Sequence, residues 1–474
     1  MSLFGKSTPP QAEEPPPTLR RAVVTGVGPV SSVGIGRNNF YQALLEGRTG
    51  FGPITLCDAS RSPSRIAAEV KDFHMDAFVS KGRIIERWAP RPVQLALAAA
   101  VLALHDAALD IGSVDPDRLA LIVGTGIGNC GHVAEQARLF ESGGNLAPVS
   151  PFLSIMHAVS CVLTSFFDLR GTATTVSTGC NSGVDALGQG LRMIQSGAAE
   201  AVLVVGVDCE VVPIILAMLN ASGSLATRYN DTPELASRPW DTERDGNVIG
   251  EGAGAILLES EEAARRRGAR LYARVAGYHM ACAGGGRRYS HDEPDLEHAT
   301  SARALRGALA DASWAADEVD LVNANGSASV LYDALEARAL SEVLGQQGPP
   351  VHSIKSMLGQ HGAASSIFQC ISACLALRRS LAPPTVNHDQ LDPACAGLNV
   401  LTRPLAQAFD RVLVHSIGLG GFYYSSAAFE HGGWDDNVTG QGLVAWSEAH
   451  HPKHIPAPEF QRPLEPWDGA ADFS

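Results

Sequence analysis

Continuous apolar runs that alternate with helical patterns are the feature that most restricts the fold of this chain. Residues 201–207 contain no polar side chain, which is typical of a strand covered on both faces. Residues 119–124 have the same character. Between residues 93 and 104 the chain is apolar nearly all round, which predicts a helix buried on most sides. Such strands and helices in alternation predict an α/β layered architecture with a mixed or parallel sheet.

The same rhythm occurs twice along the chain. The first half, residues 19–268, ends with a strand at 252–259 and a charged helix. The second half, residues 269–430, repeats the alternation. In that half we expect strands at residues 271–275, 319–323 and, as the last strand, 412–416, with helices at 302–309 and 334–344.

Two terminal segments differ from these halves in composition. Residues 1–18 are rich in proline and have few apolar side chains, so we expect a disordered leader. Residues 431–474 contain three tryptophans and several prolines. We interpret them as a C-terminal extension, part of which lies against the body of the protein or a partner.

Bulk properties of the 474 residues exclude several classes of function. The formal net charge of −14 argues against nonspecific binding of nucleic acid. Nine cysteines are spread without CxxC pairs, which favours reduced thiols in a cytoplasm over disulfides or a zinc site. No apolar run reaches the length of a membrane-spanning helix. We therefore expect a cytoplasmic protein that acts away from membranes and has neither metal nor cofactor.

One cysteine, Cys180, stands at a predicted strand-to-helix corner. A β-branched run at residues 174–176 precedes it, and a helical pattern begins at Val184. Backbone N–H groups at a helix start favour a thiolate, and they can stabilise an oxyanion when the sulfur attacks a carbonyl. A small buried cysteine that packs a helix start fits the same pattern and is the commoner case. The corner alone therefore leaves both interpretations open.

The segment around Cys180 resembles a known nucleophile motif. Residues 178–183, Thr-Gly-Cys-Asn-Ser-Gly, are similar to the motif of the β-ketoacyl-acyl-carrier-protein synthases (ketosynthases), which usually carry alanine where Gly179 and Asn181 stand. The resemblance covers about residues 20 to 430. Further family motifs follow in order: Arg238-Pro239-Trp240-Asp241, Arg244-Asp245-Gly246, Gly250-Glu251-Gly252-Ala253-Gly254, Lys355-Ser356-Met357-Leu358-Gly359 and Gly418-Leu419-Gly420-Gly421.

This resemblance implies a fold and a set of partners. The fold is thiolase-like, with two similar halves in α-β-α-β-α layers. The substrates are acyl thioesters, and malonyl thioesters where the enzyme condenses, carried by an acyl carrier protein. Ketosynthases form dimers, so we expect a homodimer or a heterodimer with another ketosynthase-like subunit. The backbone N–H groups of Cys180 and Leu419 match the family's oxyanion hole. Candidate linings of the acyl pocket are Phe152, Ile155, Met156 and Leu163.

The chain departs from the family at two catalytic positions. Asn325 and Gln360 occupy the places of the two active-site histidines. Gln360 is followed by His361, and the segment aligns with or without a one-residue gap. A shift of one residue in a helix rotates a side chain by about 100°, so His361 either points at the sulfur or packs elsewhere. Lys355 matches the motif lysine, whose alternative role is a structural ion pair with Glu336.

Three functions fit this pattern. Asn and Gln donate hydrogen bonds but cannot shuttle protons, so the first is an acyltransferase that forms an acyl-Cys180 thioester and transfers or condenses the acyl group in polyketide or fatty-acid-like biosynthesis. The second is a decarboxylating, elongating synthase in which His361 and Asn325 replace the histidine pair. The third is a non-catalytic partner subunit similar to a chain-length factor. Retention of Cys180 weighs against the third function, and the altered histidine positions weigh for it.

Overall fold

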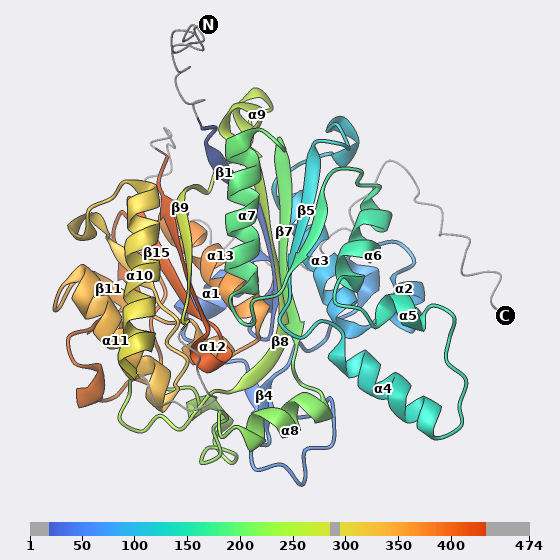
Figure 1. Ribbon diagram of the computed structural model, residues 1–474, viewed down its shortest axis with the longest axis horizontal. Coiled ribbons are helices and arrows are strands. Elements are labelled where there is room, and N and C mark those ends of the chain that lie inside the picture. The colour runs from blue at the N-terminus through green and yellow to red at the C-terminus, as the bar shows by residue number, and fades with distance from the viewer. Residues whose placement is uncertain (1–18, 285–293, 433–474) are drawn as a thin grey trace, which may run out of the picture.

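A computed structural model describes residues 19–284 and 294–432 (Figure 1). The predicted leader and nearly all of the C-terminal extension lie outside these ranges. None of the helices within them is long and apolar enough to cross a bilayer.

The first half of the chain builds one side of a large mixed sheet. The strands β1 (Ala22–Ser31), β8 (Ile249–Ser260), β7 (Ala201–Cys209), β5 (Leu119–Gly124) and β6 (Ala173–Val176) lie in this order across the sheet. The pairs β5–β6 and β5–β7 are parallel, and β7–β8 and β8–β1 are antiparallel. All of β7 is buried, as its apolar sequence predicts.

The second half repeats this pairing pattern strand for strand. The order is β9 (Ala273–Cys282), β16 (Tyr423–Glu430), β15 (Arg411–Ile417), β10 (Leu321–Asn323) and β11 (Pro350–His352). Again the two pairs that include β10 are parallel, and β15–β16 and β16–β9 are antiparallel. The halves join where β1 pairs with β9. The predicted two similar halves are therefore confirmed as a structural duplication.

The two halves of the sheet and the helices that pack on them form five layers (Figure 1). The central layer consists of α7 (Ser182–Ser196) and α13 (Ala363–Arg379), which pack on each other and on both halves of the sheet. The outer face of the first half is covered by α3 (Arg91–Asp106), and that of the second by α10 (Pro294–Ala312) with α11 (Val330–Leu344). This is the predicted α-β-α-β-α order. The nearly all-apolar α3 is buried on most sides.

Shorter elements complete the described chain. They are β2 (Gly34–Ile35), α1 (Arg37–Leu45), β3 (Phe51–Pro53), β4 (Ile66–Ala68), α2 (Gly82–Trp88), α4 (Cys130–Glu141), α5 (Ser150–Leu153), α6 (Ala158–Phe167), α8 (Pro213–Ala221), α9 (Glu261–Arg266), α12 (Lys355–Leu358), β12 (Leu381–Ala382), β13 (Asn399–Val400) and β14 (Leu405–Ala406).

One sequence-based expectation about the strands was wrong. Residues 412–416 were expected to form the last strand, but β16 follows β15 and pairs with it along its whole length. The sequence of β16 contains the pair Ser425 and Ser426, which interrupts the apolar pattern. Ser426 hydrogen-bonds His415 of the neighbouring strand at 2.8 Å, so the sheet itself satisfies this polar side chain.

Candidate active site

Cys180 lies between the end of β6 and the start of α7, as the sequence predicts. Gly179 adopts the left-handed conformation with φ +66°, which glycine tolerates without strain from a Cβ. The hydroxyl of Ser182 accepts a hydrogen bond from the Thr178 N–H at 2.8 Å and donates one to the Gly179 carbonyl at 2.6 Å. These bonds fix the turn, and Cys180 is only 7% exposed.

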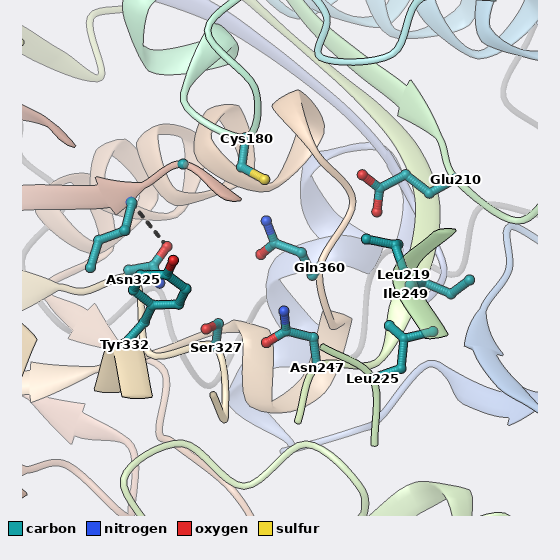
Figure 2. A pocket seen from close by; sticks show the side chains of 12 residues that line it. Cys180, Glu210, Leu219, Leu225, Asn247, Ile249, Asn325, Ser327, Tyr332 and Gln360 are labelled. Atoms are coloured by element: carbon teal, nitrogen blue, oxygen red, sulfur yellow. Dashed lines mark hydrogen bonds between the residues drawn. The ribbon is translucent and has the colours of Figure 1, made fainter. Parts of the chain in front are cut away.

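A pocket opens in front of Cys180 (Figure 2). It encloses about 480 Å³ of space between atoms, part of which is open to solvent. Part of its lining follows directly after β6, β7, β10 and β15, so the pocket lies where these strands of both halves end. Ligand sites of α/β proteins favour this edge of a sheet. The pocket is lined by Cys180, Glu210, Leu219, Leu225, Asn247, Ile249, Asn325, Ser327, Tyr332, Gln360, Ile417 and Gly418.

Asn325 is held by two donors. Its Oδ1 accepts a hydrogen bond from Lys355 Nζ at 2.6 Å and another from the Ile417 N–H at 3.1 Å. Figure 2 draws the second of these bonds. Because both donors need the amide oxygen, the amide N–H groups are the part of the side chain left for a ligand in the pocket.

Lys355 is buried among acidic groups. Its ammonium contacts Asn325, while Glu336 accepts the backbone N–H groups of Asn325 and Gly326 at 2.6 and 2.8 Å. Lys355 and Glu336 therefore interact through their charges at longer range rather than as the suggested direct ion pair. Burial lowers the pKa of Lys355, and the charges of Cys180, Glu336, Asp333 and Glu210 oppose that shift. Burial raises the pKa of Glu336.

Gln360 and His361 have different surroundings. Gln360 lines the pocket and is 9% exposed, and Figure 2 shows its amide nitrogen on the side of Cys180. His361 is fully buried, with its ring edge-on to Phe368 at 5.7 Å between centroids. A Cβ at Gly250 would lie 2.5 Å from this ring, so the glycine makes room for the histidine. Of the two residues, Gln360 lines this pocket, whereas His361 packs against Phe368 and is not among the lining residues.

Asn181 ties the cysteine turn to the second half of the chain. Its Oδ1 accepts a hydrogen bond from Ser416 Oγ at 2.8 Å, and its Nδ2 donates to the Tyr423 carbonyl at 2.9 Å. Between these two partners lie Gly418, which lines the pocket, and the turn that begins at Leu419. Asn181 therefore links the two turns, at Cys180 and at Leu419, whose backbone N–H groups are the predicted oxyanion hole.

The predicted acyl-pocket residues do not line the pocket of the single chain. Leu163 belongs to the hydrophobic core on the α3 side of the first half, because its helix α6 packs against α3. Phe152 is 67% exposed, and Met156 is also exposed. Ile155 is half-buried beside them. Whether Leu163 lines an acyl pocket stays a prediction. The other three side chains lie outside the lining residues of this pocket.

Sequence reasoning missed one acidic residue of the pocket, Glu210. It directly follows β7 and lines the pocket opposite Asn325 (Figure 2). A signal was present, since a carboxyl group after the apolar run 201–207 lies at the end of a strand that pairs parallel with β5, and such sheets bind ligands at this edge. No family motif quoted above includes this position.

Comparison with known proteins identifies the chain. Residues 19–264 match the family model of the β-ketoacyl synthase N-terminal domain, and residues 272–389 match that of the C-terminal domain. The chain belongs to the β-ketoacyl synthase family. A 3-oxoacyl-[acyl-carrier-protein] synthase 2 of Coxiella burnetii is 34% identical over 85% of this chain and 96% of its own length. The tetracenomycin ketoacyl synthase alpha subunit of Streptomyces glaucescens is 35% identical over 85% and 95%.

Solved β-ketoacyl synthase structures share the fold. A β-ketoacyl synthase from Burkholderia phymatum superposes with a TM-score of 0.80 at 28% identity, and covers 87% of this chain and 100% of its own. The ishigamide ketosynthase/chain length factor has a TM-score of 0.79 at 31% identity, with 87% and 99% covered. The chain is thus an acyltransferase of the β-ketoacyl synthase type, and its pocket carries Asn325 and Gln360 beside the cysteine.

Proposed function

We propose that this β-ketoacyl synthase takes an acyl group from an acyl carrier protein onto Cys180. It then transfers or condenses that group in polyketide or fatty-acid-like biosynthesis. The observation that carries the proposal is the position of Cys180, at the start of a long helix and facing a pocket with three amide side chains and a buried lysine nearby.

The pocket supplies the first half of the chemistry. Attack on a thioester needs a thiolate and donors for the oxyanion. Lys355 contributes a positive charge that interacts with Cys180. The backbone N–H groups of Cys180 and Leu419 are the proposed oxyanion donors, and Asn325 and Gln360 offer amide donors to a thioester or enolate oxygen.

Two other functions receive less support. An elongating synthase that relies on His361 would need the imidazole in the pocket, whereas His361 packs against Phe368. A non-catalytic partner would not need a cysteine held by its own hydrogen-bonded turn. One solved relative is a ketosynthase/chain length factor assembly, so a pairing role remains the second candidate.

The proposed partners are an acyl carrier protein and a second ketosynthase-like subunit, in the cytoplasm. A solved relative is an acyl carrier protein in complex with its ketosynthase.

The edge strand β6 ends the sheet, and exposed apolar side chains such as Phe140, Phe152 and Met156 lie in the helical region that precedes it. An unpaired edge beside apolar surface favours dimerisation there. In such a dimer Phe152, Ile155 and Met156 would be available to shape the acyl pocket.

Intact-protein mass spectrometry tests the proposal. The wild type and Cys180→Ala are incubated with a panel of acyl-carrier thioesters. We expect an acyl mass increment on the wild type that is absent from the variant. Loss of the label with release of carbon dioxide, once malonyl-carrier is added, would establish condensation, and stable acylation without carbon dioxide would indicate transfer. Absence of acylation from every donor, with tight binding to another ketosynthase, would leave the partner subunit.

A further inference from the structure

We propose that Glu210 is the proton-transferring group of this active site. It serves as the general base that accepts the proton of the acceptor nucleophile when the acyl group leaves Cys180. The inference rests on the proposed acyl-Cys180 intermediate and names the residue that performs its second half-reaction.

Glu210 faces the pocket and lacks protein partners for part of its carboxyl group. Figure 2 shows the carboxyl directed toward the space between Cys180 and Gln360. The residue is 7% exposed, and its Oε2 is buried with no hydrogen-bond partner among the described residues. Its backbone is fixed, since the Glu210 N–H donates to the Gly250 carbonyl at 3.2 Å. A buried carboxyl group without a donor is costly, which is unusual unless a ligand completes it.

The neighbouring residue Asp208 has a structural role, because its carboxyl group is fully hydrogen-bonded within the protein. Its oxygens accept hydrogen bonds from Thr125 Oγ1 at 2.7 Å and from the N–H groups of Gly126 and Ala363 at 2.8 and 2.7 Å. These bonds hold the loop after β5 to the start of α13. Glu210, two residues further along, has no comparable set of donors.

Electrostatics prepares Glu210 for proton transfer. Burial raises the pKa of Glu210 well above its ordinary value, the charge of Asp208 adds to the rise, and Lys355 opposes it. A carboxyl group in this state keeps its proton to a higher pH than an exposed carboxyl group does, and it is a stronger base when ionised. The amide side chains that line the pocket with Cys180, among them Asn325 and Gln360, cannot accept or release protons in this range.

Glu210 gives up one proton and regains one proton in each acyl-transfer cycle. The Cys180 thiolate attacks the carrier thioester, the C–S bond to the carrier breaks, and the departing carrier thiolate takes the proton of neutral Glu210. A protic acceptor, an alcohol, amine or thiol, then gives its proton to the Glu210 carboxylate as it attacks the acyl-Cys180 carbonyl. The Cys180 thiolate leaves, and Glu210 is protonated again. The net reaction converts acyl thioester and acceptor into acyl acceptor and carrier thiol.

Two half-reactions allow a sharp test with the full chain. Wild type, Glu210→Gln and Glu210→Asp are acylated with a carrier thioester and separated from the donor. N-acetylcysteamine is then added as the acceptor probe, and mass spectrometry follows loss of the acyl group from the protein and formation of the acyl probe. Glu262→Gln is the control, because this side chain is 76% exposed on α9 and pairs with Arg266.

We expect Glu210→Gln still to form acyl-Cys180, because the carrier thiolate departs before it is protonated and water can supply that proton in place of Glu210. Its transfer to the probe should be slower by about 10²- to 10⁴-fold. Glu210→Asp should transfer the acyl group at least about tenfold faster than Glu210→Gln, since a titratable group remains. Glu262→Gln should match the wild type in both steps.

Transfer by Glu210→Gln within about threefold of the wild type would overturn the inference while leaving acyl-Cys180 intact. A wild type that no donor acylates would overturn the proposed function and this inference with it. Thermal unfolding accompanies the assay, and Glu210→Met replaces the amide variant if that variant does not fold. Slow transfer by a folded variant that still forms acyl-Cys180 supports the assignment.

Discussion

The ammonium of Lys355 donates a 2.6 Å hydrogen bond to the amide oxygen of Asn325, 30 residues earlier in the chain. This contact links the family's motif lysine to the residue that stands in place of a catalytic histidine. Asn325 is therefore part of a buried polar network as well as of the pocket wall, and its replacement should affect both stability and chemistry.

Asn325→Ala should lower the free energy of unfolding by about 2–4 kcal/mol. The substitution leaves Lys355 Nζ and the Ile417 N–H without their shared acceptor, and an unsatisfied buried charge costs more than a neutral group. Urea unfolding measures the change. Ser327→Ala removes a hydroxyl from the same pocket without touching Lys355, and should cost less than about 1 kcal/mol. Equal losses in the two variants would contradict the network.

Asn325→His combined with Gln360→His should increase decarboxylation. Both positions line the pocket, and imidazoles can donate to a developing enolate and move protons, which amides cannot. We expect at least about tenfold more carbon dioxide from a malonyl-carrier thioester than the wild type releases. Release of labelled carbon dioxide measures this rate. An unchanged rate in a folded double variant would show that the two amides do not limit condensation.

His361→Leu should reduce the acid sensitivity of the fold. Burial lowers the pKa of His361 to about 3, against about 6.5 in an unfolded chain. The unfolded state therefore binds the extra proton between pH 6.5 and 3, and stability is lost as pH falls through this window. Within this window the unfolding free energy of the variant should fall less steeply than that of the wild type, with a slope smaller by about 1.4 kcal/mol per pH unit.

Unfolding of the His361→Leu protein in urea at several pH values measures that slope. Cys180 acylation should persist in the variant, because the ring lies against Phe368 and Gly250 rather than in the pocket. Loss of acylation in a stable His361→Leu protein would revive the alternative in which this histidine is catalytic.

Asn181→Ala should weaken the link between the two halves at the active site. It removes the acceptor of Ser416 Oγ, a buried contact, and the donor to the Tyr423 carbonyl, a part-buried one. We expect a loss of about 1–3 kcal/mol in unfolding free energy and slower Cys180 acylation. The exposed Asn399, changed to alanine, is the matched control. Full stability of Asn181→Ala would mean that the loop before β16 is held by other contacts.

Gly183→Ala should be strongly destabilising. A Cβ at this position would lie 2.4 Å from the Ala363 carbonyl oxygen, where α7 crosses the start of α13. Because the obstacle is backbone, relief requires the two central helices to separate, at a cost of at least about 2–3 kcal/mol. Thermal and urea unfolding report the loss. A Cβ at Gly284 meets no atom of the described residues within 4 Å, so Gly284→Ala should be nearly neutral.

Much of the fold follows from local sequence patterns. The apolar runs of β5 and of residues 201–207 in β7 are long enough to specify buried strands, because a polar residue buried on either face would need a hydrogen-bond partner there. The strand β16 escaped prediction because its serine pair is satisfied only by tertiary contacts, with His415 of the neighbouring strand for Ser426 and with Asn181 for Ser425.

The sequence by itself determined that Cys180 stands at a strand-to-helix corner and that the chain carries the motifs of a ketosynthase. Only the tertiary structure decided which of Gln360 and His361 faces the pocket, since one residue of register separates them and the packing of Phe368 and Gly250 selects the outcome. It also brought Glu210 to the pocket. Its place there depends on the convergence of strand ends from two halves of the chain, which no local pattern encodes.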